Sequence, residues 1–294
     1  ITLPIQPFTP AYGREYFLRV GFRLVKDQSW ARAGYEIAWE QMPVTVNAAI
    51  AGGNHITPDV NLAEDGKGIT VEGPGFRVVF DKATGSISKL ERDGVELLAS
   101  GGGPQLHLWR APHRIDDEWA YRDWEAYALT GLGRDPVRLV AEKREGGVRV
   151  ESIVRLTGKR GFTVMHSAGY FITGDGTIFV DNAVSPSGPR IPLARIGVRM
   201  ILDAKFDRFA YLGRGPMENY PDRKTGSDVG LYRSTVRQQV TPYAKPMENG
   251  NHEDVRWAAV YGTDRPALVA KANGGLLSVS ALPWTDEQMT PVEY

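Results

Sequence analysis

Short segments in which apolar and polar residues alternate recur along most of this chain, and turn-forming residues separate them. This two-residue period is typical of β-strands whose two faces meet different surroundings. From Gly75 onward the predicted strands are residues 76–80, 87–90, 137–142, 148–156, 162–172, 177–184, 196–202, 207–212, 238–240, 255–261, 268–272 and 276–281. Strands this numerous need two large stacked sheets or a barrel to cover their apolar faces. The sequence therefore predicts an all-β fold.

Two further strands are predicted near the N-terminus, at residues 15–24 and 35–40. They alternate like strands of an antiparallel sandwich, but they are too few to close one. The stretch 48–75 is rich in Gly, Asn, Asp and Pro, and we place a domain boundary near residues 61–67. We therefore expect part of a β-sandwich at 1–64 and a large antiparallel β domain at 65–294.

One internal helix is predicted at residues 116–129, with Asp116 or Asp117 as its cap and Gly131 as its stop. Near the end of the chain, Thr285 and Gln288 have the spacing of a capping box, which marks a helix start. The chain begins with Ile1 rather than Met and stops soon after that signal. We therefore expect a piece of a longer polypeptide.

The charge balance argues against nucleic acid as a partner. Lys plus Arg and Asp plus Glu both total 35, so the formal net charge is zero, and no long-range field draws the chain to a polyanion or an anionic membrane. No apolar run approaches the roughly 20 residues that a membrane helix needs. The chain has no cysteine, so disulfides and thiolate sites are excluded, while a cytoplasmic and a periplasmic location both stay open.

Several familiar sites are missing from the sequence. There is no Gly-x-Gly-x-x-Gly, no P-loop, no His-Glu-x-x-His and no Gly-x-Ser-x-Gly. The five histidines are dispersed, and the acids at 116–118 near His113 are explained by a helix N-terminus, which attracts acidic residues. We predict no metal site and no cofactor in this chain.

The densest cluster of polar and aromatic residues runs from Tyr211 to Trp257, and within it Pro-Met-Glu-Asn occurs twice, at 216–219 and 246–249. Prolines and glycines on either side predict ordered loops. Two such loops joined by a strand can face each other. Glycoside hydrolysis needs a pair of carboxyls, which makes Glu218 and Glu248 candidates. The alternative is that these side chains cap backbone groups at turns.

Ten residues are candidate carbohydrate contacts. An aromatic face can stack on a sugar ring and an Arg fork can hold planar acceptors, so the Trp-Arg-Ala-Pro segment at 109–112 joins the polar loops in this set. Core packing is the alternative for Trp109. The candidates are Trp109, Arg110, Arg214, Glu218, Asn219, Asp222, Arg223, Glu248, Asn249 and His252.

Long motifs resemble a known family. YLGRGPMENYPDRKTGSDVGLY followed by TPYAKPMENGNHEDVRW resembles the C-terminal domain of large bacterial β-galactosidases of glycoside hydrolase family two. FRVVFDKATGSISKL, WRAP and SVSALPWTDEQM fit the same domain in the same order. Upstream, EYFLRVGFRLVKD and WARAGYEIAWEQMPV resemble the last strands of the immunoglobulin-like domain that precedes it.

This resemblance implies a partial immunoglobulin-like sandwich followed by a β supersandwich of the galactose-mutarotase type. It also implies that the catalytic glutamates, with their magnesium and sodium ions, lie on a barrel that this chain lacks. No catalytic role passes to Glu218 or Glu248. We expect the chain to be inactive alone, with the rest of a β-galactosidase as its partner and galactose or lactose as possible ligands.

Two alternatives are a stand-alone carbohydrate-binding module and an aldose-epimerase-like protein. The β edges of a partial sandwich also predict a tendency to form homo-oligomers.

Overall fold

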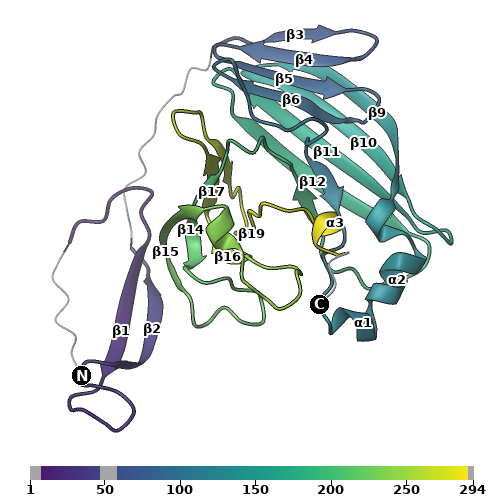
Figure 1. Cartoon of the computed structure of the whole chain (residues 1–294). Helices are drawn as coiled ribbons and strands as arrows, with labels where there is room; N and C mark the ends of the chain where they lie inside the picture. Colours follow the sequence, from purple (N-terminus) through teal and green to yellow (C-terminus); the bar gives the residue numbers. More distant parts are fainter. Residues whose placement is uncertain (1–7, 47–57, 291–294) are drawn as a thin grey trace. The chain divides into compact units, whose positions relative to one another are not determined.

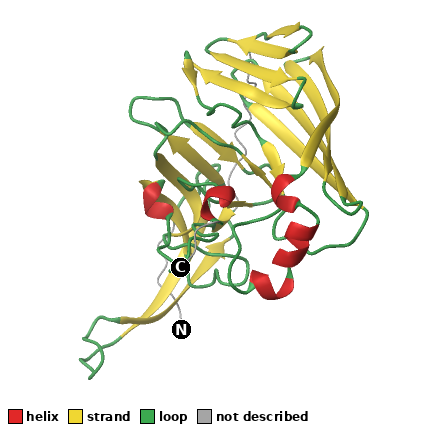
Figure 2. Cartoon of the chain, turned by 45° about the vertical axis from the view of Figure 1, so that its right-hand side comes forward, coloured by secondary structure: helices red, strands yellow, loops and turns green. Residues whose placement is uncertain are grey.

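The computed structural model describes residues 8–46 and 58–290. The fold is mostly β, with antiparallel sheets and a few short helices (Figures 1 and 2), so the all-β prediction is confirmed. The chain divides into two compact units, Ile1–His55 and Ile56–Tyr294. Each unit is described separately.

The first unit contains a two-stranded antiparallel sheet of β1 (Tyr16–Arg23) and β2 (Glu36–Val44), as the alternation predicts. Tyr16 lies opposite Val44 in its register. The sheet exposes large apolar side chains, with Phe22 at 66% and Trp39 at 40% of full exposure.

The second unit begins with a five-stranded sheet that lies against a four-stranded one (Figure 1). The first has the order β3–β4–β5–β6–β7, with bounds Asn61–Glu64, Gly68–Gly73, Phe76–Asp81, Ser86–Arg92 and Val95–Glu96. The second has the order β12–β11–β10–β9, with bounds Ile178–Ser187, Thr163–Thr173, Gly147–Thr157 and Gly133–Arg144. The expected boundary at residues 61–67 falls on β3 and the turn before β4, and β3 pairs with β4 within the second unit.

The core between these sheets follows from the alternation. On β11 every second residue is buried, and Ile172 on this strand is fully enclosed. Phe80 in β5, on the facing sheet, is fully enclosed as well. The predicted hairpin of β5 and β6 is present, and Gly85 in its turn has φ +65°, a conformation that glycine adopts without steric cost. A second cluster at one end of the sheets includes Trp124 and Phe162.

The single helix predicted at 116–129 is wrong. The chain forms two short helices, α1 (Asp116–Trp119) and α2 (Tyr121–Ala126), and then a 3₁₀ turn at Leu129–Gly131. Ala120, with φ −140°, interrupts the helix, and Ala128 is left-handed. The N-cap is Ile115, whose side chain has no acceptor for a capping hydrogen bond, and the carboxylate of Asp116, the predicted cap, binds Arg110.

The rest of the second unit contains a sheet of order β15–β14–β17–β18 and two strand pairs, β13–β8 and β16–β19. The bounds are Gln105–His107 for β8, Gly197–Arg199 for β13, Arg208–Gly215 for β14, Asp228–Thr235 for β15, His252–Val255 for β16, Trp257–Tyr261 for β17, Leu268–Lys271 for β18 and Leu277–Val279 for β19. Its small core includes Phe209, Tyr211 and Val255.

Three strand predictions in this region need correction. Residues 238–240 lie mainly in a 3₁₀ turn, Arg237–Gln239, in which Val240 N donates to the carbonyl of Arg237. The strand predicted at 196–202 is shortened to β13, and the one at 255–261 is divided between β16 and β17. The capping box is confirmed: Thr285 accepts from the backbone of Gln288 at the start of α3 (Asp286–Met289).

Candidate functional site

The two Pro-Met-Glu-Asn loops face each other, as expected. The Asn219 N–H donates to the carbonyl of Asn251 at 2.8 Å, and the Gly250 N–H donates to Glu218 Oε2 at 2.7 Å. Each copy also forms the same internal bond, because its Asn side chain donates to the carbonyl of the Met two residues earlier, at 2.9 Å in the first copy and 2.7 Å in the second. The repeated tetrapeptide is therefore a repeated turn.

Glu218 is fully engaged by its neighbours. Its carboxylate accepts from the Tyr243 hydroxyl, from Arg223 Nη2 at 2.6 Å and from the Gly250 N–H. Burial raises the pKa of Glu218, but the hydrogen bonds from Tyr243, Gly250 and Arg223 outweigh it, so the net pKa lies below its usual value. This carboxyl is held as an anion.

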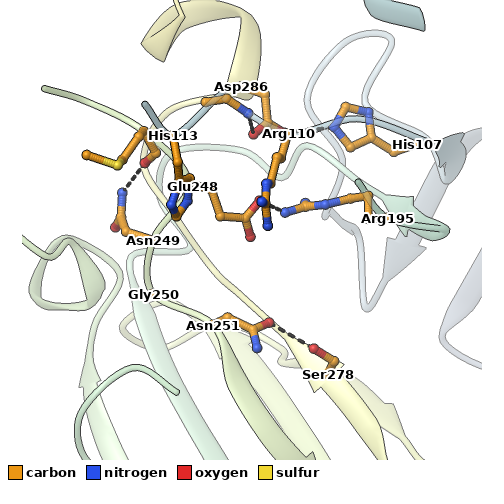
Figure 3. Close-up of polar contacts among 12 residues, drawn as sticks. His107, Arg110, His113, Arg195, Glu248, Asn249, Gly250, Asn251, Ser278 and Asp286 are labelled. Carbon is orange, nitrogen blue, oxygen red and sulfur yellow. Dashed lines mark hydrogen bonds and ion pairs between the residues drawn. The ribbon is translucent and has the colours of Figure 1, made fainter. Parts of the chain in front are cut away.

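Glu248 belongs to a separate cluster of charged side chains that includes Arg195 and Asp286 (Figure 3). These residues come from segments far apart in the sequence. The Glu248 side chain is nearly buried and forms an ion pair with Arg195. Its backbone N–H donates to the carbonyl of Ala111 at 3.1 Å, and the Ala111 N–H in turn donates to Asp286 at 2.8 Å. Asp286 also contacts His107 Nε2 at 2.8 Å.

A third group joins the second loop to β19. Asn251 Nδ2 donates to the carbonyl of Asn219 at 2.8 Å and to Glu253 Oε1 at 2.9 Å. The Ser278 hydroxyl lies 2.9 Å from Asn251 Oδ1 (Figure 3) and 2.6 Å from Glu253 Oε1. The buried polar atoms of this loop are thereby satisfied within the protein.

His252 is buried in the same region and packs against an aromatic ring. Its ring centroid lies 4.1 Å from that of Tyr211, and its Nδ1 lies 3.1 Å from the carbonyl oxygen of Arg214. Burial lowers the pKa of His252 to about 4, so the ring is neutral near pH 7. The Arg214 side chain turns to Asp254, with its Nε 2.5 Å from Oδ2.

The ten predicted contact residues therefore do not form one surface. Trp109 is only 3% exposed and belongs to the hydrophobic core, and Arg110 pairs with the buried Asp116. Five of the candidates, including Trp109, are buried: Trp109, Asn219, Glu248, Asn249 and His252. Sugar contact stays a prediction, and the exposed side chains of Asp222 and Arg223 are the ones accessible for it.

Sequence reasoning missed several residues of this site. Tyr243 lies inside the polar stretch, so its position was a usable signal, and Asp286 follows the capping residue Thr285. Arg195 stands in a segment without any recognisable motif. Within residues 8–46 and 58–290, no three His, Asp or Glu side chains gather as a metal site would require.

The chemistry open to these groups is limited. Glu218 and Glu248 each form an ion pair with a guanidinium, and His252, which follows the second loop, is buried and neutral near pH 7. Contacts of this kind hold the two loops in a defined arrangement. None of the described helices is long and apolar enough to cross a membrane.

Comparison with known proteins gives a consistent result. Residues 72–294 match the family described as β-galactosidase small chain, and residues 1–45 match domain 4 of β-galactosidase. The chain is 30% identical to a β-galactosidase of Priestia megaterium over 95% of its own length and 27% of that protein. It is 28% identical to one of Lactobacillus delbrueckii subsp. bulgaricus, over 95% of this chain and 27% of the relative.

A third relative extends the likeness. The chain is 29% identical to a β-galactosidase of Kluyveromyces lactis, over 80% of this chain and 23% of the relative. The chain thus spans about a quarter of the length of these relatives. Because a single family description covers residues 72–294, the chain belongs to the β-galactosidase small-chain family.

Proposed function

We propose that this chain is a non-catalytic, C-terminal portion of a β-galactosidase that hydrolyses terminal β-D-galactosides such as lactose. In this proposal the carboxylates that cleave the glycosidic bond, and any magnesium or sodium ions, belong to the rest of the enzyme. The chain supplies architecture. Its partner is the remaining β-galactosidase polypeptide, in keeping with a family described as a small chain.

The observation that carries this proposal is the engagement of both candidate glutamates. A glycosidase needs one carboxyl that is protonated and one that is ionised, both reaching the same scissile bond. Glu218 is held ionised by Tyr243, Gly250 and Arg223, and Glu248 is nearly buried against Arg195. Glu218 is therefore an anion without a proton to offer, and Glu248 is engaged by Arg195.

The polar groups instead have a structural role. The Glu218 carboxylate joins the first loop to the second through Gly250. Asp286 joins α3 to the segment at His107 and Ala111. Bonds between segments so far apart in sequence fix the loops to one another and so shape a surface for the partner polypeptide.

Complementation tests the proposal. The probe is the Priestia megaterium β-galactosidase from which the stretch aligned with this chain has been deleted. The deletion enzyme alone and the chain alone are expected to leave a chromogenic β-galactoside intact, whereas the mixture is expected to hydrolyse it. Hydrolysis by the chain alone, or an inactive mixture, contradicts the proposal.

A further inference from the structure

A large open groove runs through the second unit. It has a volume of about 2440 Å³, and β12, β13, β18 and β19 contribute to its walls. Pockets for small molecules usually have volumes of roughly 300–1,000 Å³. A groove this large fits a polypeptide segment better than it fits a single sugar.

The walls of the groove carry exposed apolar side chains. Phe179 and Val180 on β12 are 46% and 47% exposed, Val198 on β13 is 46% exposed, and Val269 on β18 is 55% exposed. The other large apolar side chains that are exposed and line the groove are Ile196, Met200, Ile201, Leu276 and Trp284. Scattered apolar residues on a surface are ordinary, but this many on the walls of one groove indicate an interaction site.

Two of the wall strands also have an open edge. In the part of the chain that the structure describes, β12 pairs with β11 alone and β18 pairs with β17 alone. Their groove-lining residues are 178–180 and 182 on β12 and 268–271 on β18. An open edge presents backbone N–H and C=O groups that an additional extended strand can satisfy.

We propose that this groove binds an extended, apolar segment of the β-galactosidase polypeptide that lies outside residues 1–294. The volume, the exposed apolar walls and the two open edges together describe a strand-forming occupant. The relatives are about four times as long as the part this chain covers, so such segments are available in the same enzyme. This inference rests on the proposed function, since it locates the surface through which the chain joins its partner.

Two matched substitutions test the location. Val198→Asp places a charge on the groove wall, and Val137→Asp places the same charge on β9, outside the groove, at 48% exposure. Both side chains are about half exposed, so the folds are expected to survive, which circular dichroism checks. Val269→Asp, on the wall strand β18, provides a second groove variant.

Binding is measured by titration calorimetry against the Priestia megaterium deletion enzyme. The groove variants are expected to weaken binding at least about tenfold, because the occupant would cover a charged carboxylate in place of an apolar valine side chain. Val137→Asp is expected to bind like the parent chain. Sedimentation velocity of the chain alone tests whether a second copy occupies the groove.

The outcomes separate the two proposals. If Val198→Asp and Val269→Asp bind the deletion enzyme like the parent chain, the groove is not the binding site and this inference fails, while the proposed function stands. If the parent chain does not bind the deletion enzyme at all, the proposed function fails and this inference fails with it. Self-association that the groove variants abolish, without an effect on binding of the deletion enzyme, identifies a second copy as the occupant and overturns the inference.

Discussion

Replacing Asp286 with Ala tests the role assigned to the polar network. Asp286 is 7% exposed and accepts from the Ala111 N–H and from His107, both at 2.8 Å. Its neighbour Glu287 pairs with Arg199 at 2.8 Å but has a side chain that is 43% exposed. Both residues lie in the first turn of α3, so Glu287→Ala is a control with the same helical context.

The expected difference follows from burial. Asp286→Ala leaves the His107 and Ala111 donors buried without an acceptor, and each such loss costs about 1–3 kcal/mol of unfolding free energy. The sum is about 2–6 kcal/mol, whereas removing an exposed ion pair such as Glu287–Arg199 costs about 0–1 kcal/mol. For a domain of this size, 1 kcal/mol shifts the melting temperature by roughly 2–4 °C.

Acid provides a second readout for the same substitution. Burial raises the pKa of Asp286, but the His107 hydrogen bond, the Arg195 charge and the Ala111 N–H outweigh it, so the net pKa is lowered. A carboxyl with a lowered folded-state pKa contributes stability above its unfolded pKa of about 4 and loses it as the pH falls through the folded value. The difference in melting temperature between the parent chain and Asp286→Ala is therefore expected to narrow below about pH 4.

Thermal unfolding of the purified chain, followed by circular dichroism at pH 7 and at lower pH, measures both effects. Equal melting temperatures for Asp286→Ala and Glu287→Ala at pH 7 would refute the assigned role. A difference between the parent chain and Asp286→Ala that widens on acidification would refute the assigned sign of the pKa shift.

Two further substitutions address the core and the buried histidine. Trp124→Ala removes a fully buried indole that donates to the carbonyl of Pro192 at 2.8 Å. Urea unfolding is expected to show a loss of about 3–5 kcal/mol of unfolding free energy, against about 1 kcal/mol or less for Trp119→Ala at a side chain that is 51% exposed. Equal losses for the two variants would contradict the assigned core. Because burial lowers the pKa of His252 to about 4, stability is expected to be constant above about pH 6.5 and to fall between there and pH 4 by roughly 3 kcal/mol. The urea midpoint of His252→Phe is expected to vary less over this range, and an unchanged pH slope would contradict the prediction.

Regular alternation made much of the second unit predictable. β10 and β11 were located because every second residue on them meets a core, a pattern that sequence displays directly. The sequence did not predict β15 (Asp228–Thr235), because this strand begins in the polar stretch and contains Gly230, and a glycine weakens the strand pattern. The helix at 116–129 was drawn too long because the break at Ala120 reflects tertiary packing, with Trp124 buried and Trp119 exposed.

The site was predictable to the extent that it is local. The repeated tetrapeptide indicated two facing loops, and the Glu218–Gly250 bond joins them. Glu248 drew attention as half of a catalytic pair, but its partner is Arg195, which no local pattern connects to it. Ion pairs between distant segments depend on the fold as a whole, so they emerge only from the structure.

The central claim is that this chain has no glycosidase activity of its own. The most direct measurement is hydrolysis of a chromogenic β-galactoside by the purified chain, with and without magnesium, beside its Glu218→Gln and Glu248→Gln variants. We predict no turnover in any of these samples. Turnover by the parent chain that either substitution abolishes would contradict the account, because it would make one of these engaged carboxylates a catalytic group.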